Sequence, residues 1–488
     1  MAIPFAGIPN PILTPGAYIE YNAERALQGL APLPNRVLLV GARLAAGAIP
    51  ANTLTLIRSA GDADTMFGRG SQIGAMAKAF KAVNQTTELW GCGLTAAGTA
   101  ATKTITVSGT ATGAGTLHFW VGGRGPIDVA VASGAIATAV ASAIDAAFAL
   151  FEADWMYTFA VTAAVVTGTS RHGAAFGQDF DIRLNYGSRE SLDAPPGITI
   201  AIANGVSGAT DPAVSAAITA IGDQWFQTIV SGVNLDANMD LWETFAAAQW
   251  GPLIQQDVMV FAGYAGVYAD ALTYAGDRNS QFTVVPYMGV TPTPWWETVT
   301  RVAAASTAEP DPARPRQTLS IGAVSGPPVS AAFTRSDRET LLAAGISTLK
   351  IALDGAVTIE RLVTTYTTNP AGLPDATFRN LETMLTLFAL RFTTRARFQS
   401  KYPRHKLASD DANYGAGQAV ITPKVARGEL IALARQWEQS AWVEGIEQFK
   451  ADLLVERNAS DRDRLDALLV PDLVNQFRVF AGQIAFIL

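Results

Sequence analysis

The side chains best suited to acid–base, nucleophilic or metal chemistry are few in this sequence. Its three histidines, His118, His172 and His405, lie far apart along the chain. Ser170 stands two positions before His172, but the members of a catalytic triad meet in space and are not sequence neighbours. The chain also lacks a GxSxG nucleophile elbow, an HExxH pair and an EF-hand loop. We therefore predict that the protein is not an enzyme and binds no metal or cofactor.

The clearest charge feature is a basic run, in which no acidic residue occurs between Arg391 and Ser409. Arg391 and Arg395 are one helical turn apart, so the run is typical of the solvated face of a helix. It could instead bind an acidic protein partner or, less favourably, a nucleic acid. The residues of this run expected to contact a partner are Arg391, Arg395, Arg397, Lys401, Arg404 and Lys406.

Acidic residues follow this basic run. Asp410 and Asp411 come first, and a wider group contains Glu438, Glu444, Glu447, Asp452 and Glu456. Opposed charged patches on one chain can match head to tail between copies. Such heterologous contacts build rings or open helices rather than closed dimers.

The composition indicates a surface that is largely covered in an assembly. Of the 488 residues, 49% are hydrophobic and only 16% are charged, against roughly a quarter charged in typical domains. The net charge of −7 argues against non-specific nucleic-acid binding. The single cysteine, Cys92, excludes a disulfide framework and fits a reducing cytoplasm. Without a signal peptide or a run of about 18 apolar residues, we expect a soluble protein with no membrane insertion.

The last eighteen residues, PDLVNQFRVFAGQIAFIL, are the most informative stretch. From Phe477 onward only Arg478 and Gln483 are clearly polar, whereas free termini are usually polar and fray. The Phe, Val and Ile content suits a β-strand that is buried on both faces. This strand belongs either to the chain's own sheet or, by β-augmentation, to the sheet of another subunit.

The N-terminus is expected to form a second extended arm. Prolines at positions 4, 9, 11 and 15 exclude a helix there, and residues 16–22 are a short strand candidate. Prolines flank both arm strands, which predicts hinges at 30–35 and 469–472. The residues expected to form inter-subunit strands are Tyr18, Ile19, Tyr21, Phe477, Val479, Phe480, Ile484, Phe486 and Ile487, and the hinge prolines are Pro32, Pro34 and Pro471.

Alternating strand and helix patterns predict an α/β multidomain protein with a mainly parallel sheet, whose first buried strand is the apolar run at 36–41. A Gly-, Ala- and Thr-rich region with period-2 strands interrupts this alternation. The expected parts are an N-terminal arm (1–35), an α/β core (36–90 and 206–310), an inserted β-rich surface domain (91–205), an α+β C-terminal domain (311–470) and a C-terminal arm strand (471–488). Among the expected elements are helices at 211–222, 336–344, 375–402, 422–440 and 460–469, and strands at 348–353, 357–366 and 446–456.

Several ordered motifs resemble the contractile-tail sheath proteins of Mu-like phages, a family related to the sheaths of R-type pyocins and type VI secretion. None of these motifs is diagnostic alone, whereas their order across nearly the whole chain is. They include DPARP (311–315), RETLLAAGI (338–346), GAVTIER (355–361), KYPRHKLA (401–408), Thr422-Pro423 and the C-terminal PDLVNQFRVFAGQIAFIL.

The resemblance implies a structural subunit that polymerises as stacked hexameric rings around a tail tube and contracts to drive the tube through the host cell envelope during genome ejection. In such sheaths the terminal arms add strands to neighbouring subunits. A subtilisin-like core, baseplate and tail-terminator partners, and a virion assembled in the host bacterial cytoplasm are also implied. The basic run would contact the tube loosely, because exposed ion pairs contribute only about 0–1 kcal/mol each. A static tube, baseplate or surface-layer protein is the alternative, and an enzyme with a hidden site is a more remote one.

Overall fold

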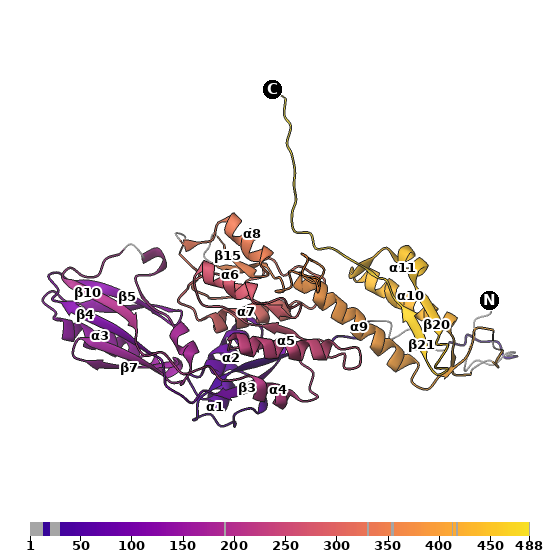
Figure 1. The fold of residues 1–488 in the computed structure, drawn as a ribbon, viewed down its shortest axis with the longest axis horizontal. Coiled ribbons are helices and arrows are strands. Elements are labelled where there is room, and N and C mark those ends of the chain that lie inside the picture. The colour runs from indigo at the N-terminus through magenta and orange to yellow at the C-terminus, as the bar shows by residue number, and fades with distance from the viewer. Residues whose placement is uncertain are drawn as a thin grey trace. The chain divides into compact units, whose positions relative to one another are not determined.

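The computed structural model describes residues 13–19, 30–189, 192–328, 331–352, 356–411, 413–415 and 418–487. The chain forms two compact units. The smaller unit contains Met1–Leu33 and Leu390–Val474, and the larger unit contains Pro34–Ala389 and Asn475–Leu488. The chain therefore leaves the larger unit after Ala389 and returns to it at Asn475 (Figure 1).

A six-stranded sheet forms the centre of the larger unit, in the order β13-β12-β11-β1-β3-β2. All its pairs are parallel except that of β2 with β3, which is antiparallel. Val37 to Val40 of β1 are completely buried, as expected for a parallel strand covered on both faces. The predicted, mainly parallel sheet is confirmed. Its strands are β1 (Arg36–Arg43), β2 (Leu54–Ile57), β3 (Glu88–Thr95), β11 (Thr228–Ser231), β12 (Met259–Phe261) and β13 (Thr283–Val284).

Helices pack against this sheet and against one another. Ser71 begins α2 by accepting a hydrogen bond from the backbone N–H of Gly74 at 3.1 Å, and Met76 and Phe80 of that helix are completely buried. The helix predicted from Asp211 begins only at Ser215, because the Asp211 carboxylate instead accepts the N–H of Phe176 at 2.8 Å. The helices are α1 (Ala60–Phe67), α2 (Gln72–Val83), α4 (Ser215–Ile221), α5 (Asp236–Trp250), α6 (Tyr268–Gly276) and α7 (Trp295–Ala308).

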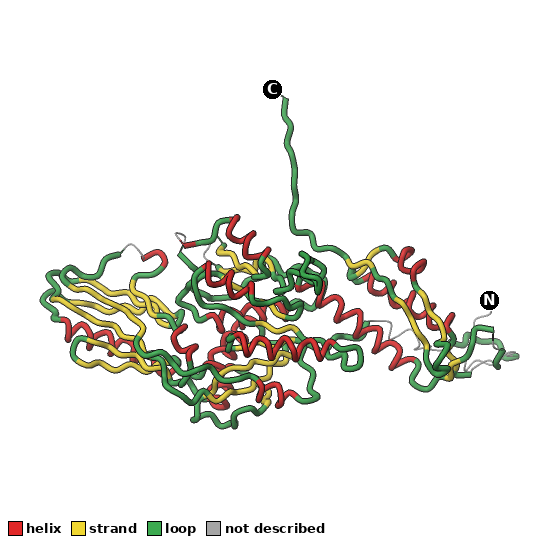
Figure 2. The backbone as a smooth tube through the Cα atoms, viewed as in Figure 1, coloured by secondary structure: helices red, strands yellow, loops and turns green. Residues whose placement is uncertain are grey.

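Short antiparallel strands make up most of the region between β3 and α4 (Figure 2). They form a four-stranded sheet, β10-β4-β8-β7, and a three-stranded sheet, β6-β5-β9. Strand β3 extends to Thr95, so residues 91–95 lie in the core sheet although the composition placed them in the insertion. The elements are β4 (Thr102–Gly109), β5 (Gly115–Val121), β6 (Arg124–Val131), α3 (Ala137–Ala149), β7 (Tyr157–Thr162), β8 (Val165–Ser170), β9 (Ile182–Leu184) and β10 (Ile198–Asn204), with short 3-10 turns at Glu152–Asp154, Ala175–Asp179 and Gly187–Arg189.

The larger unit also contains a small sheet, β14-β15-β16, and helix α8. The predicted hairpin is confirmed by the antiparallel pair of β15 and β16. Helix α8 begins one residue before the predicted start at 336 and has a capping box, in which Thr334 and Asp337 exchange hydrogen bonds with each other's backbone N–H at 2.8 and 3.2 Å. These elements are β14 (Pro286–Tyr287), α8 (Arg335–Ala343), β15 (Ser347–Ile351) and β16 (Val357–Arg361).

The smaller unit has its own hydrophobic core, which includes Leu430, Leu433, Trp437 and Phe449. Thr422 begins α10 as predicted and accepts the N–H of Val425. Helix α9 begins at Leu381, later than predicted. The elements from α9 onward are α9 (Leu381–Lys401), β17 (Lys406–Leu407), β18 (Val420–Ile421), α10 (Pro423–Gln439), β19 (Val443–Glu444), α11 (Ile446–Asp452), β20 (Leu454–Arg457), β21 (Leu465–Leu468) and β22 (Asp472–Leu473).

Two predictions in this unit are wrong. The strand predicted at 446–456 is helix α11 followed by β20. Ile446, Phe449 and Leu453 are spaced three and four residues apart, which lets a helix direct Phe449 toward the core. The helix predicted at 460–469 is a turn followed by β21, which pairs antiparallel with β20.

Candidate assembly interface

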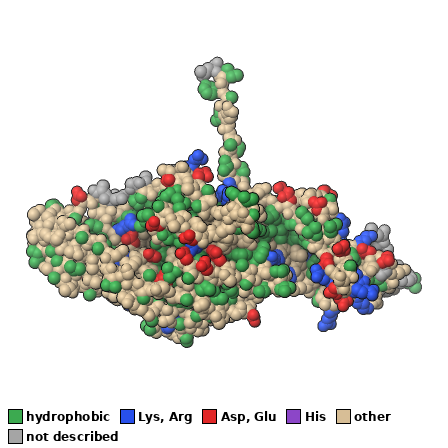
Figure 3. All heavy atoms as spheres, in the orientation of Figure 1, with side chains coloured by type: hydrophobic (Ala, Val, Ile, Leu, Met, Phe, Trp, Pro, Cys, Tyr) green, Lys and Arg blue, Asp and Glu red, His purple; other side chains and the backbone are tan. Residues whose placement is uncertain are grey.

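The strongest candidate for an interface is the C-terminal segment, residues 475–487. It has no helix or strand and is drawn as an extended chain in Figures 1 and 2. It pairs with none of the described strands of its own chain. Of the two interpretations of this segment, donation to another subunit is therefore the one that we propose below. Figure 3 shows hydrophobic atoms along it. Its large apolar side chains are Phe477 (72% exposed), Val479 (81%), Phe480 (84%), Ile484 (90%), Phe486 (77%) and Ile487 (100%).

An exposed segment of this kind is costly unless something covers it. Large apolar side chains that gather on a surface mark binding sites or aggregation sites. Unpaired strand-like backbone also offers N–H and C=O groups to another chain. Both features make the segment the candidate interface of this subunit.

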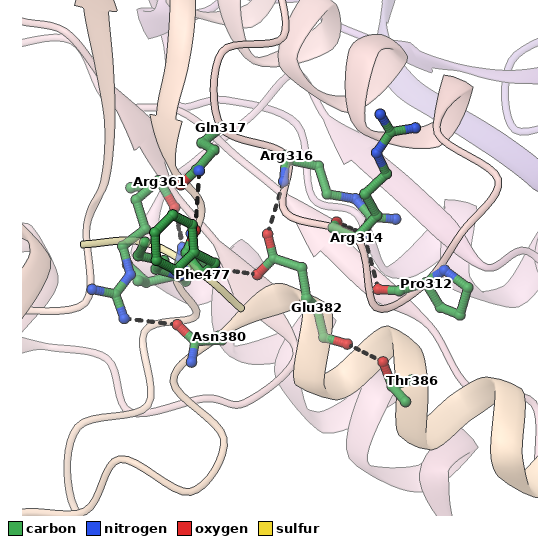
Figure 4. A network of polar contacts seen from close by, with 12 residues as sticks. Pro312, Arg314, Arg316, Gln317, Arg361, Asn380, Glu382, Thr386 and Phe477 are labelled. Atoms are coloured by element: carbon green, nitrogen blue, oxygen red, sulfur yellow. Dashed lines mark hydrogen bonds and ion pairs between the residues drawn. The ribbon is translucent and has the colours of Figure 1, made fainter. Parts of the chain in front are cut away.

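The first residues of the segment are fixed to the larger unit (Figure 4). Arg478 donates a hydrogen bond from Nη2 to Oε2 of Glu382 at 2.8 Å. Gln317 donates one to the carbonyl oxygen of Phe477 at 3.3 Å. The Glu382 side chain is completely buried and that of Arg478 is 13% exposed. Because a buried charge requires a partner, this ion pair fixes the point at which the segment leaves the unit.

The loop before α8 supports the same carboxylate. The backbone N–H of Arg316 donates to Oε1 of Glu382 at 3.1 Å. The buried Arg316 guanidinium donates in turn to the carbonyl oxygens of Pro312 and Arg314, at 2.9 and 2.6 Å. Glu382 therefore joins the C-terminal segment to the irregular 310–328 loop and to the start of α9.

The N-terminal arm is described only in part. Tyr18 is 49% exposed and Ile19 is 84% exposed, and Tyr21 lies outside the described residues. Residues 16–19 form no strand, so the described half of the strand predicted at 16–22 is an extended loop. The Tyr18 and Thr14 hydroxyls lie 2.9 Å apart.

The predicted hinge prolines lie next to unit or element boundaries. Pro32 and Pro34 are in residues 30–35, which have no strand before β1 begins at Arg36. The two units meet in sequence between Leu33 and Pro34. Pro471 directly precedes β22, which pairs with β19. Bending at these positions remains a proposal.

Part of the basic run pairs within the smaller unit. Arg397 and Lys401 of α9 both contact Glu429 of α10, at 3.4 and 2.6 Å. The Tyr402 hydroxyl also donates to Glu429 at 3.0 Å. Sequence reasoning missed Glu429 because it follows Lys401 by 28 residues on the next helix. A helical plot of α10, which places Glu429 beside Ala426, Leu430 and Leu433, could have identified it as a half-apolar position facing α9.

The other basic residues are spread along the end of α9 and the loop that follows. Arg391 is half-buried and has a partner within the chain. Arg395 lies against the ring of Phe392, with 5.7 Å between the guanidinium carbon and the ring centroid. Arg404 and Lys406 are exposed. The structure therefore does not gather all six cations into one exposed patch.

Two family models match this chain. The one described as the phage tail sheath protein central domain matches residues 207–365, and the one described as the phage tail sheath C-terminal domain matches residues 374–487. The Mu-like prophage FluMu tail sheath protein of Haemophilus influenzae is 35% identical over the full length of both chains. The chain belongs to the phage tail sheath family.

Solved structures support the fold of this sheath subunit. The sheath tail protein from Desulfitobacterium hafniense aligns with a TM-score of 0.50 and 13% identity, over 94% of this chain and 100% of that one. The sheath tail protein from Listeria innocua aligns with a TM-score of 0.50 and 14% identity, over 93% and 95%. The predicted mixed α/β multidomain fold is confirmed.

The residues singled out for chemistry have structural contacts in this sheath subunit, whose family is a structural one. The buried His172 imidazole accepts the backbone N–H of Gln72 at 3.1 Å, and Ser170 accepts the backbone N–H of His172. Burial lowers the pKa of His172 to about 4, so the ring is neutral at pH 7. Among the described residues, no three His, Cys, Asp or Glu side chains are grouped to hold a metal ion, and none of the helices combines the length and apolar character that crossing a membrane requires.

A polar cavity of about 290 Å³ lies where the inserted region meets the loops after β12 and β14 of the sheath subunit. Lys103, Asp179 and Trp295 line it, and Trp295 donates a hydrogen bond to Oδ2 of Asp179 at 2.8 Å. Burial raises the pKa of Asp179 to about 6. The hydrogen bond from Trp295 lowers the pKa of Asp179, and so does the charge of Lys103, whereas the charge of Asp211 raises it.

We expect Asp179→Asn to change how stability depends on pH. A carboxyl whose pKa is raised on folding binds its proton more tightly in the folded state, so this contribution is complete below about pH 4 and is lost as the pH rises through about 6. The loss is about 1–3 kcal/mol, at about 1.4 kcal/mol per pKa unit. Urea unfolding at pH 5 and pH 8 should therefore show a smaller difference for Asp179→Asn than for the unaltered protein.

Glu297→Gln is a second variant for this experiment, measured at intermediate pH values as well, because it should also reduce the difference between pH 5 and pH 8. Burial raises the pKa of Glu297 to about 7, so its step should lie at a higher pH than that of Asp179. If Asp179→Asn shows the same pH dependence as the unaltered protein, Asp179 is not the group that titrates near pH 6.

Proposed function

We propose that this protein polymerises as stacked hexameric rings around a tail tube and contracts to drive the tube through the host cell envelope during genome ejection. The observation that supports the proposal is the exposed, apolar C-terminal segment of a tail sheath subunit, whose first residues are fixed to the larger unit. The proposed partners are further copies of the chain, the tail tube protein, and baseplate and tail-terminator proteins. The proposed location is the virion, after assembly in the host cytoplasm, and the proposed core fold is subtilisin-like.

The C-terminal segment offers both backbone groups and apolar side chains to a neighbouring subunit. An added strand would form four to six backbone hydrogen bonds, each contributing about 1 kcal/mol net. Each large apolar side chain that becomes buried would add about 1.5–3 kcal/mol. Ordering the segment costs about 1–2 kcal/mol per residue, so side-chain burial determines the strength of the contact.

The proposed acceptors are the short sheets of the smaller unit. Strands β19 and β22 form one two-stranded ladder, and β20 and β21 form another. Within the described residues each ladder has two open edges. An open edge accepts an extended segment by β-augmentation. We propose that the segment of one copy adds to one of these edges in the next copy, and that bending at the hinge prolines accommodates contraction.

The basic run is retained as the proposed contact with the tube. Arg404 and Lys406 are the best-supported members because they are exposed. Arg397 and Lys401 already pair with Glu429, so they would support the tube contact only by positioning the exposed part of the basic run. Contacts of this kind are weak when solvated, which suits a tube that must slide.

Cryo-electron microscopy of the protein co-expressed with its tail tube tests the function. A sheath should give two helical forms of one subunit, a longer form around the tube and a shorter one after triggering with mild denaturant. A static tube or baseplate protein should give a single form under both conditions, and that result would reject contraction.

A further inference from the structure

Four arginines, called the arginine cluster here, lie close together where the C-terminal segment meets the larger unit. Arg478 pairs with the buried carboxylate of Glu382, and the backbone N–H of Arg316 donates to the same carboxylate. The charges of Glu309 and Asp311 also act on Arg316. Burial lowers the pKa of Arg361, and the positive charges of Arg478 and Arg379 lower it further, while Glu382 and the exposed Glu339 act in the opposite direction. The members of the arginine cluster are Arg316, Arg361, Arg379 and Arg478.

The arginine cluster also lacks hydrogen-bond acceptors. Arg478 uses Nη2 for Glu382, and Arg361 uses Nη2 for Asn380 at 2.9 Å. Buried guanidinium nitrogens without an acceptor among the described residues remain on every member. A buried donor without an acceptor is destabilising, and more so when it is charged. These nitrogens are Arg316 Nε, Arg361 Nε, Arg379 Nε and Arg478 Nη1.

We propose that a carboxylate from a second copy of this chain completes the arginine cluster. The inference rests on the proposed strand donation, since it places the arginine cluster of one copy beside the smaller unit of the next. Planar guanidinium groups bind carboxylates through paired hydrogen bonds, which makes an acidic side chain the matching ligand.

The acidic group noted in the sequence supplies such side chains at the proposed acceptor strands. Glu444 lies in β19 and Glu456 lies in β20, and both are exposed. If pairing begins at Val479, Arg478 directly precedes the paired strand. The arginine cluster then lies next to the acceptor edge of the second copy. Glu444 or Glu456 of the second copy is therefore the carboxylate that we assign.

Arg379→Glu tests this assignment without removing the Arg478–Glu382 ion pair. We expect the critical concentration for polymerisation, measured by sedimentation, to rise roughly tenfold to a hundredfold, because the change removes one charge partner and repels the incoming carboxylate. Combining Arg379→Glu with Glu444→Arg or with Glu456→Arg should restore most of this loss. Arg58→Glu, the same charge change at an exposed site of the larger unit, should change the critical concentration less than threefold, on the order of a surface ion pair.

Two results would overturn the inference. The first is an unaltered critical concentration for Arg379→Glu, and the second is a loss that neither acidic reversal restores. A chain that ends at Arg478, which keeps the arginine cluster, separates this failure from that of the proposed function. If the shortened chain fails to polymerise while Arg379→Glu polymerises normally, strand donation stands and only the charge contact is rejected. Arg379→Gln, which adds no charge, replaces Arg379→Glu if the latter melts more than a few degrees below the unaltered protein.

Discussion

A chain that ends at Arg478 should fold and yet form no polymers. It keeps the ion pair of Arg478 with Glu382 and also β22, whose neighbour Val474 donates a backbone hydrogen bond to Trp442 at 3.1 Å, so the smaller unit retains all its described strands. It loses five large apolar side chains that are 77% exposed or more. We expect the critical concentration to rise more than about a hundredfold, since a loss of about 2.8 kcal/mol is enough for that. Electron microscopy and sedimentation of the full and shortened chains measure the effect.

Point substitutions refine this experiment because a strand has two faces. In an extended strand Phe480, Ile484 and Phe486 share one face, while Val479 and Gln483 lie on the other. Phe480→Asp should raise the critical concentration roughly tenfold to a hundredfold by removing about 1.5–3 kcal/mol of burial. Gln483→Asp, which places the same group at a polar position, is the matched control. Normal polymers from the shortened chain would show that the segment is not the assembly device.

Glu382→Ala should be the most destabilising single change where the C-terminal segment is fixed to the larger unit. It leaves the Arg478 guanidinium and the Arg316 N–H without their acceptor in a buried site. Removing one partner of a buried ion pair costs about 3–5 kcal/mol, which corresponds to a melting temperature lower by roughly 5–10 °C. Calorimetry of the unassembled protein measures the shift, and hydrogen exchange at Phe477 and Arg478 should become faster.

Two further variants show whether the cost comes from the unpaired charge. Glu339→Ala removes an exposed carboxylate (68% of its side chain is accessible) that is 3.9 Å from Arg335, and it should cost less than about 1 kcal/mol. The double variant Glu382→Met with Arg478→Met should recover much of the stability, because replacing both ions by apolar groups is often nearly neutral. Equal melting temperatures for Glu382→Ala and Glu339→Ala would contradict a structural role for the ion pair.

Local signals in the sequence were sufficient for much of the fold. The apolar run at 36–41 predicted β1, and Thr422-Pro423 predicted the start of α10. These features depend on neighbouring residues, so the sequence contains the information directly. The Asp211-Pro212 pair carries the same kind of signal, yet Asp211 binds the N–H of Phe176 and no helix starts there. A tertiary contact outweighed the local preference.

The geometry of the candidate interface was harder to predict. The apolar character of the C-terminus could be read from composition alone, and its role in assembly stays a prediction. The Arg478–Glu382 pair joins positions 96 residues apart, and no periodicity connects them. Glu429 likewise pairs with Lys401 across 28 residues. Such pairs depend on the completed fold. The sequence therefore predicts that all six cations of the basic run are exposed for binding, whereas the structure pairs some of them within the chain.

The position of Arg478 determines how the subunit bears mechanical load. If a neighbouring copy pulls on residues 479–487, the tension passes along the chain toward the N-terminus and first reaches the ion pair with Glu382. Only if that contact breaks does the tension reach β22 and the smaller unit, which begin further back along the chain. Under the proposed strand donation, the larger unit of the donating copy therefore takes the tension before its own smaller unit does. In the accepting copy, the ladder to which the strand is added takes the tension directly.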